Sequence, residues 1–90
     1  MKRQPTKDLV LGILLGAGAI TPRHTTEWFN EGDYCVLNVV KPYPTDLEKW
    51  SDALGTLDEV FEPENHSELN IMFDDGQITV TIANLAPKAQ

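Results

Sequence analysis

The chain has 90 residues, which suffice for a single domain with a modest core and not for two domains. Its formal net charge of −7 disfavours direct binding to nucleic acid or to an anionic membrane. The single cysteine, Cys35, excludes an internal disulfide and is typical of a reducing compartment, so we expect a cytoplasmic protein.

The N-terminal segment has two interpretations. Basic residues precede an apolar run over residues 9–20, and small residues near its end have the form of a signal-peptide cleavage site. The run is shorter than the roughly 20 residues that cross a bilayer. We favour a short buried helix with Thr6 as its N-cap and Asp8 in its first turn, ending near Gly16 or Gly18.

Residues 25–40 predict a β-hairpin. Residues 34–40 are rich in β-branched and apolar types and predict a strand that is buried on both sides. Residues 25–29 fit a partner strand, joined by a turn with Gly32 in the left-handed region, although a short helix capped at Gly32 is the alternative. In a hairpin one of Trp28 and Phe29 faces away from the core, and Trp28 is our candidate for a partner contact.

A second helix is expected from Thr45 onward. Thr45 and Glu48 have the spacing of a capping box, with Thr45 as the N-cap. Gly55 lies either inside this helix or at a break between two helices, and Pro63 ends the run in both cases. Apolar residues at intervals of three and four form one stripe that we assign to the core, namely Leu47, Trp50, Leu54, Leu57 and Phe61.

The C-terminal part predicts a second hairpin around a turn at Asp75-Gly76. Its register pairs Asp74 with Gln77, and so places six apolar residues on one core face: Leu69, Ile71, Phe73, Ile78, Val80 and Ile82. Asn70, Met72, Thr79 and Thr81 form the other, nearly polar face. Two hairpins with helices on one face of the antiparallel sheet give a two-layer α+β sandwich over residues 1–90.

The reactive side chains form no recognisable catalytic motif. Cys35 lies in the most apolar strand, where a thiol is usually inert, and no Cys or His pair has zinc spacing. The acids of residues 64–68 with Asp74 or Asp75 do not match a calcium loop. We therefore predict no catalytic residue, no metal and no cofactor, and hence a protein that is not an enzyme.

Acidic residues are the strongest functional signal. Residues 50–90 carry the whole net charge, with no Lys or Arg before Lys88. A solvated, solubilising surface explains such charge, but purely structural surfaces usually intersperse the two signs. The predicted partner-binding residues are Asp52, Asp58, Glu59, Glu62, Glu64, Glu68 and Asp74, together with Trp28.

The charge and size favour a small inhibitor that docks an acidic face on a basic site of a partner protein, such as a nuclease or another nucleic-acid-binding protein. Immunity proteins, antitoxins and phage-encoded inhibitors of host defence, including DNA mimics, act in this way as classes, and the analogy is one of charge and size. The alternative is an assembly or regulatory subunit, such as a homodimer, that pairs through an exposed strand edge at 25–29 or 78–82.

Overall fold

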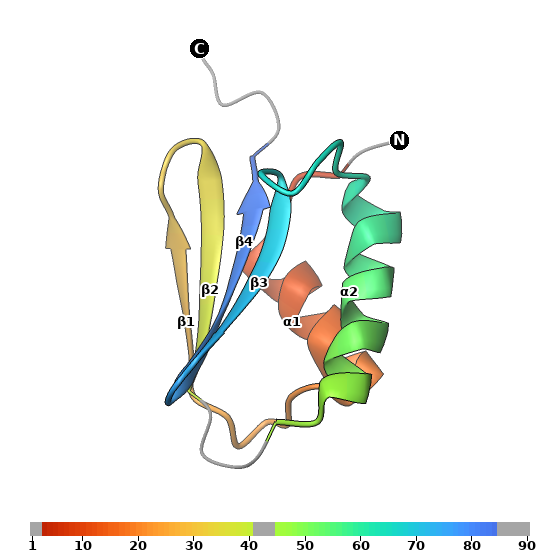
Figure 1. The fold of residues 1–90 in the computed structure, drawn as a ribbon. Helices are drawn as coiled ribbons and strands as arrows, with labels where there is room; N and C mark the ends of the chain where they lie inside the picture. The colour runs from red at the N-terminus through yellow and green to blue at the C-terminus, as the bar shows by residue number, and fades with distance from the viewer. Residues whose placement is uncertain (1–2, 41–44, 85–90) are drawn as a thin grey trace.

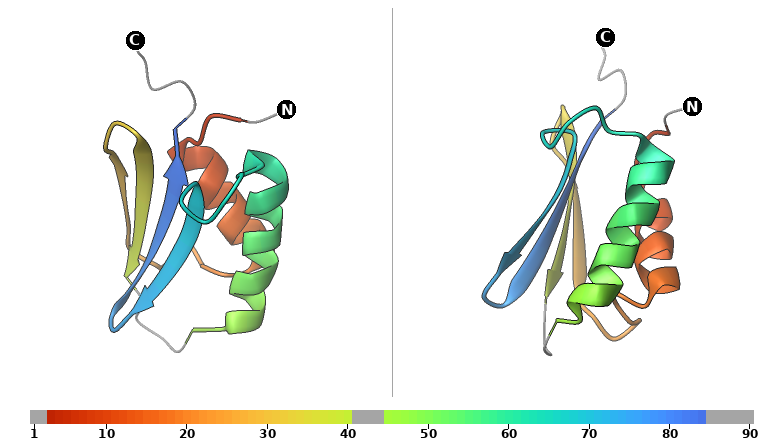
Figure 2. Two further views of the ribbon diagram at one scale, coloured as in Figure 1. Left: turned by 45° about the horizontal axis from the view of Figure 1, so that its top comes forward. Right: turned by 45° about the vertical axis from the view of Figure 1, so that its right-hand side comes forward.

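The computed structural model describes residues 3–40 and 45–84. Its elements are α1 (Lys7–Ala17), β1 (Thr26–Asn30), β2 (Tyr34–Val40), α2 (Leu47–Phe61), β3 (Leu69–Asp74) and β4 (Gln77–Ala83). The strands form one antiparallel sheet in the order β1-β2-β4-β3. Both helices lie on the same face of this sheet, as Figures 1 and 2 show from three directions, which confirms the predicted two-layer α+β sandwich.

Helix α1 has the predicted caps. The Thr6 hydroxyl accepts a hydrogen bond from the backbone N–H of Leu9 at 3.3 Å. Gly18 ends the helix with φ of 79°, a left-handed conformation that glycine adopts without steric cost. Val10 and Leu14 are buried in the core, so the N-terminal apolar run is the buried helix that we favoured. Within the described parts of the chain, no helix is both long and apolar enough to cross a bilayer.

The first hairpin is confirmed, with Trp28 opposite Leu37 and Gly32 at a φ of 77° in the connecting loop. The prediction that its second strand is buried on both sides is wrong. Cys35, Leu37 and Val39 are buried, whereas the alternating residues of β2 are half-buried or exposed. Because both helices cover the same face, the side chains that point to the other face remain accessible.

Helix α2 begins one residue later than predicted. The carboxylate of Asp46 accepts hydrogen bonds from the backbone N–H groups of Glu48 and Lys49, so Asp46 is the N-cap. The Thr45 hydroxyl oxygen is buried without a hydrogen-bond partner in the described structure. The helix continues through Gly55, so the alternative of a break at this residue is wrong.

The second hairpin has the predicted register, from Asp74 opposite Gln77 to Leu69 opposite Ile82. Its core face is correct for Leu69 and for the three apolar residues of β4. Phe73, in contrast, is 46% exposed, and Ile71 is half-buried. These two side chains lie on the outermost strand, where packing partners are present on one side only.

The apolar stripe of α2 is divided between the core and the surface. Trp50, Ala53, Leu57 and Phe61 are buried, as their positions on one helical face require. Leu47 and Leu54, which we assigned to the core, are 65% and 40% exposed. Both lie on the flank of α2 that faces β3, beyond the part of the sheet that the helix covers.

The topology also corrects one predicted pairing edge. Residues 78–82 belong to β4, which lies between β2 and β3 and therefore has both of its edges hydrogen-bonded. The outer strands of the sheet are β1 and β3.

Asn84 fastens the end of β4 to neighbouring segments. Its side-chain N–H₂ group donates to the side-chain oxygen of Asn30 and to the carbonyl of Gly32. Its side-chain oxygen accepts from Gln4 and from the thiol of Cys35. One amide therefore ties the first hairpin to the N-terminal segment with all its polar atoms in use.

Because the apolar stripe of α2 is partly buried and partly exposed, we expect the same substitution to have very different effects on stability at two of its positions. Leu57→Ala removes a fully buried side chain and is expected to lower the free energy of unfolding by about 2–5 kcal/mol. Leu47→Ala on the same helix is expected to change it by less than about 0.5 kcal/mol, because Leu47 is mostly exposed. Urea denaturation followed by circular dichroism measures both, and equal losses would contradict the assigned packing.

Candidate functional site

An open groove of about 750 Å³ lies between α2 and β3, and we call it the α2–β3 groove. The loop that connects these two elements also contributes to its lining. Its volume is in the range of protein sites that bind small molecules or side chains. The lining residues are Leu47, Trp50, Ser51, Leu54, Gly55 and Asp58 from α2, Pro63, Glu64, Asn65 and His66 from the loop, and Leu69, Asn70, Ile71 and Phe73 from β3.

The walls of the groove expose apolar surface, whereas its base belongs to the core. Leu47, Leu54 and Phe73 are exposed by 65%, 40% and 46%. Trp50 is only 3% exposed, and its ring is nearly perpendicular to the ring of Phe73, with 5.9 Å between the ring centroids. Several large apolar side chains around one concavity are unusual on a soluble monomer and are typical of a contact surface.

The backbone of β3 is unpaired on its outer edge within the described structure. The N–H of Ala83 donates to the carbonyl of Glu68 at 2.9 Å, which identifies Glu68 and Ala83 as a hydrogen-bonded pair. Because such pairs alternate along an antiparallel ladder, Asn70, Met72 and Asp74 also direct their backbone groups toward β4. The N–H and C=O groups of the intervening residues Leu69, Ile71 and Phe73 therefore point to the open edge.

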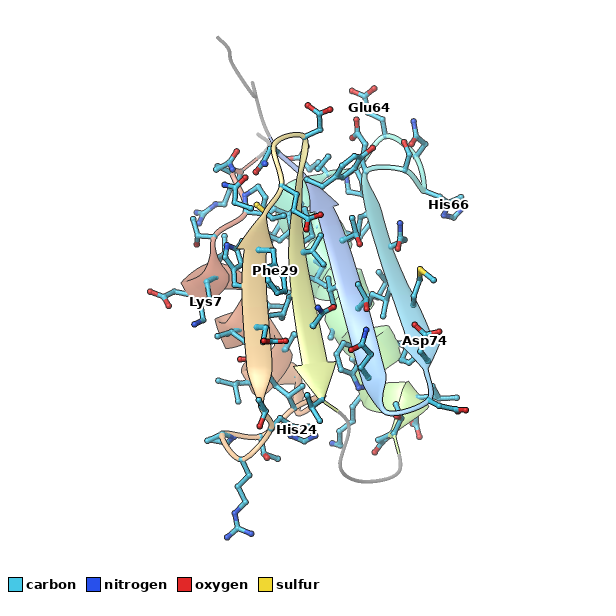
Figure 3. All side chains as sticks on the ribbon, turned by 90° about the vertical axis from the view of Figure 1, so that its left-hand side faces the viewer. Lys7, His24, Phe29, Glu64, His66 and Asp74 are labelled. Carbon is cyan, nitrogen blue, oxygen red and sulfur yellow. The ribbon has the colours of Figure 1, made fainter. Side chains whose placement is uncertain are left out.

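Asp58 and Glu64 place two carboxylates in the lining of this groove, and no Lys or Arg is present among its lining residues. Glu64 and His66 both extend from the loop at one end of the sheet (Figure 3). A cationic group that approaches the groove thus meets negative charge next to apolar surface.

The other predicted acids do not converge on the groove. Asp52 and Glu59 are seven residues apart on α2 and lie on the exposed face opposite its buried stripe. Glu62 forms the left-handed C-cap of α2, with a φ of 47°. Glu68 lies in the connecting loop, where its carboxylate accepts a hydrogen bond from the backbone N–H of Glu64 at 2.9 Å.

Asp74 and Trp28 lie elsewhere on the sheet. Asp74 is on the face that the helices leave open, at the end of β3 (Figure 3). Trp28 points to the helix-covered face and packs partly buried against the core, so its neighbour Phe29 is the aromatic residue that faces outward, with 40% exposure. The predicted set of partner-binding residues is therefore distributed over several directions, with Asp58 and Glu64 in the groove.

The apolar part of the site was not predicted from the sequence. Leu47, Leu54 and Phe73 were placed in the core because their spacing matches that of the buried residues on the same elements. Their exposure follows from the strand order, because β3 is the outermost strand and has a neighbouring strand on one side only. That order is not determined by hairpin patterns, because it depends on how the two hairpins associate.

The Cys35 thiol and the His24 ring each take part in a hydrogen bond within the fold. The Cys35 thiol is 1% exposed and donates to the side-chain oxygen of Asn84 at 2.9 Å. Burial raises the pKa of this thiol, while the Asn84 hydrogen bond opposes the shift. His24 Nδ1 accepts a hydrogen bond from the backbone N–H of Thr21 at 3.0 Å. The described residues contain no group of three or more potential metal ligands.

The environment of Cys35 predicts slow chemical modification. Iodoacetamide reacts with thiolates, and both burial and the raised pKa of Cys35 keep the thiolate scarce in the folded protein. Alkylation at mildly alkaline pH, followed by mass spectrometry, is expected to be many-fold slower in buffer than in concentrated urea. Equal rates in the two solutions would contradict the buried placement.

No protein-family model, curated protein or solved structure matches this chain.

Proposed function

We propose that this protein is a small, non-catalytic binding module that holds an apolar and basic segment of a partner protein in the α2–β3 groove. The observation that carries the proposal is the exposure of Leu47, Leu54 and Phe73 around one groove of about 750 Å³. Keeping these side chains in water costs roughly 25 cal/mol for each Å² of apolar surface, and a partner that covers them recovers that free energy.

Charge supports a basic partner. Asp58 and Glu64 line the groove, and the sequence has no Lys or Arg from residue 50 to residue 87. The acids that lie outside the groove, such as Asp52 and Glu59, add to the negative field that speeds the approach of a cationic surface. In this proposal, apolar contacts in the groove stabilise the complex, and the surrounding acids select a basic partner.

Within this function we favour an inhibitor of a nuclease or another nucleic-acid-binding protein, acting in the cytoplasm. Such targets present basic clefts, and a protein with a net charge of −7 competes with nucleic acid for them. The single buried Cys35, which forms no disulfide, suits a reducing compartment.

If a partner binds in the α2–β3 groove, a negative charge placed in this groove is expected to weaken binding. A displayed library of random peptides is selected on the wild-type protein, and the enriched peptides are expected to combine apolar residues with Lys or Arg. Leu54→Asp should weaken their binding by roughly tenfold or more, because it puts a carboxylate where an apolar side chain is covered. Fluorescence anisotropy of the labelled peptides measures the dissociation constants.

Leu15→Asp is the matched control for this experiment. Leu15 lies on α1 and is 41% exposed, against 40% for Leu54, so the two variants carry the same change at equal exposure. The control is expected to bind the selected peptides as the wild-type protein does. Peptides that bind both variants equally well would show that the groove is not the contact surface.

The electrostatic part of the proposal has a separate test. Asp58→Asn is expected to weaken the selected peptides by roughly two- to fivefold, whereas Asp52→Asn on the outer face of α2 should have a smaller effect. Affinity for the wild-type protein should also fall between about 0.1 M and about 1 M salt, as screening increases. An affinity that stays constant over this range contradicts selection by charge.

A further inference from the structure

We propose that the partner segment binds in an extended conformation, as an additional strand beside β3, and that its sequence alternates apolar and basic residues. The inference rests on the proposed function and specifies how the α2–β3 groove is occupied. It joins two observations, the apolar groove and the unpaired backbone edge, that lie on the same strand.

The backbone of β3 offers the hydrogen-bonding groups for such a strand. The N–H and C=O groups of Leu69, Ile71 and Phe73 point to the open edge, because the alternating residues bond to β4. These are the residues whose side chains lie on the helix-covered face and line the groove. A peptide that pairs with them is therefore brought directly alongside the groove, which is the geometry of recognition by strand addition.

The pleat then determines the sequence of the bound segment. Side chains next to Ile71 and Phe73 on the added strand point into the groove, toward Leu54 and Trp50, where apolar side chains are favoured. The alternating side chains point to the open face, beside Met72 and Asp74. Asp74 is exposed there, and the adjacent turn carries Asp75, so Lys or Arg is favoured at these positions.

The same charges disfavour a second copy of this chain as the occupant. If two β3 strands paired antiparallel about Ile71, Asp74 of each copy would lie opposite Glu68 of the other. Like charges at both ends of the pairing oppose such a dimer. A basic segment places cations at these positions, so charge complementarity selects a heterologous partner.

β3 is a better receptor edge than β1, although both are outer strands. The groove adjoins β3, and its exposed apolar side chains come from β3 and from the flank of α2. At the opposite edge α1 lies behind β1 (Figure 3), and Trp28 packs against the core. An added strand at β3 gains contact with the apolar groove as well as backbone hydrogen bonds.

Synthetic peptides test the inference. The probe is the labelled heptapeptide Lys-Val-Lys-Leu-Lys-Val-Lys, and its control has the same composition with the apolar residues in one block. Fluorescence anisotropy at low salt is expected to show at least roughly tenfold tighter binding of the alternating peptide. Leu54→Asp should abolish this binding, and Leu15→Asp should preserve it.

Two N-methylated versions of the alternating peptide test the backbone pairing. One carries N-methyl groups on its apolar residues and the other on its internal lysines, so that each blocks the amides of one strand edge. Only one version is expected to lose binding, by roughly tenfold or more, because only one edge of the peptide faces β3. Loss in the apolar version indicates antiparallel pairing, and loss in the lysine version indicates parallel pairing.

A protein variant gives an independent readout. The N–H of Ile71 points to the open edge, so Ile71→Pro removes this donor without removing a hydrogen bond to β4. It should bind the alternating peptide roughly tenfold more weakly than Ile71→Ala, which loses side-chain contact and keeps the donor. If Ile71→Pro does not fold, as judged by urea denaturation, the methylated peptides decide the question.

Two results overturn the inference while leaving the proposed function intact. One is equal binding of the two N-methylated peptides. The other is failure of the alternating peptide to bind while library-selected peptides bind in a manner that depends on Leu54. Formation of dimers by the unliganded protein, with loss of dimers in Ile71→Pro by light scattering, would identify a second copy as the occupant and would also overturn it.

Discussion

The packing of Trp50 between α2 and the sheet is the interaction on which the rest of the site depends. Trp50 is 3% exposed, belongs to the core cluster and also forms the base of the α2–β3 groove. Its ring meets Phe73 edge-on at 5.9 Å, which connects the N-terminal half of α2 to the outermost strand. The helix is thereby held beside β3 while the flank residues Leu47 and Leu54 remain in contact with water.

This arrangement separates residues that stabilise the fold from residues that are available to a partner. The base of the groove is shared with the core, so a change at Trp50 affects stability and binding together. The walls, formed by Leu47, Leu54 and Phe73, keep much of their apolar surface exposed, and Leu47, which is 65% exposed, contributes least to folding.

In the proposed function, the acidic residues act at two ranges. Asp58 and Glu64 are close enough to the groove to contact a bound segment, whereas Asp52 and Glu59 face away from it. In water, charges beyond about 10 Å are largely screened at moderate salt, so the distant acids influence approach more than the final contact. Counting acids along the sequence therefore overestimates the contact surface, because a helix distributes adjacent residues around its axis.

Local sequence chemistry by itself determined the elements and much of their pairing. The Thr6 cap, the glycine that ends α1 and the Asp75-Gly76 turn act over a few residues, so they were predictable without tertiary information. Thr45 and the adjacent Asp46 are both favourable N-cap residues, so the sequence did not show that the Asp46 carboxylate, rather than the Thr45 hydroxyl, caps α2.

Only the tertiary structure decided which apolar residues are core and which are surface. Trp50 and Leu54 share one stripe, and Phe73 shares a face with Val80, but the strand order β1-β2-β4-β3 leaves β3 outermost and exposes Leu54 and Phe73. Periodicity defines which residues share a face, whereas burial depends on what packs against that face. Here the sheet ends at β3, before it covers the whole apolar stripe of α2.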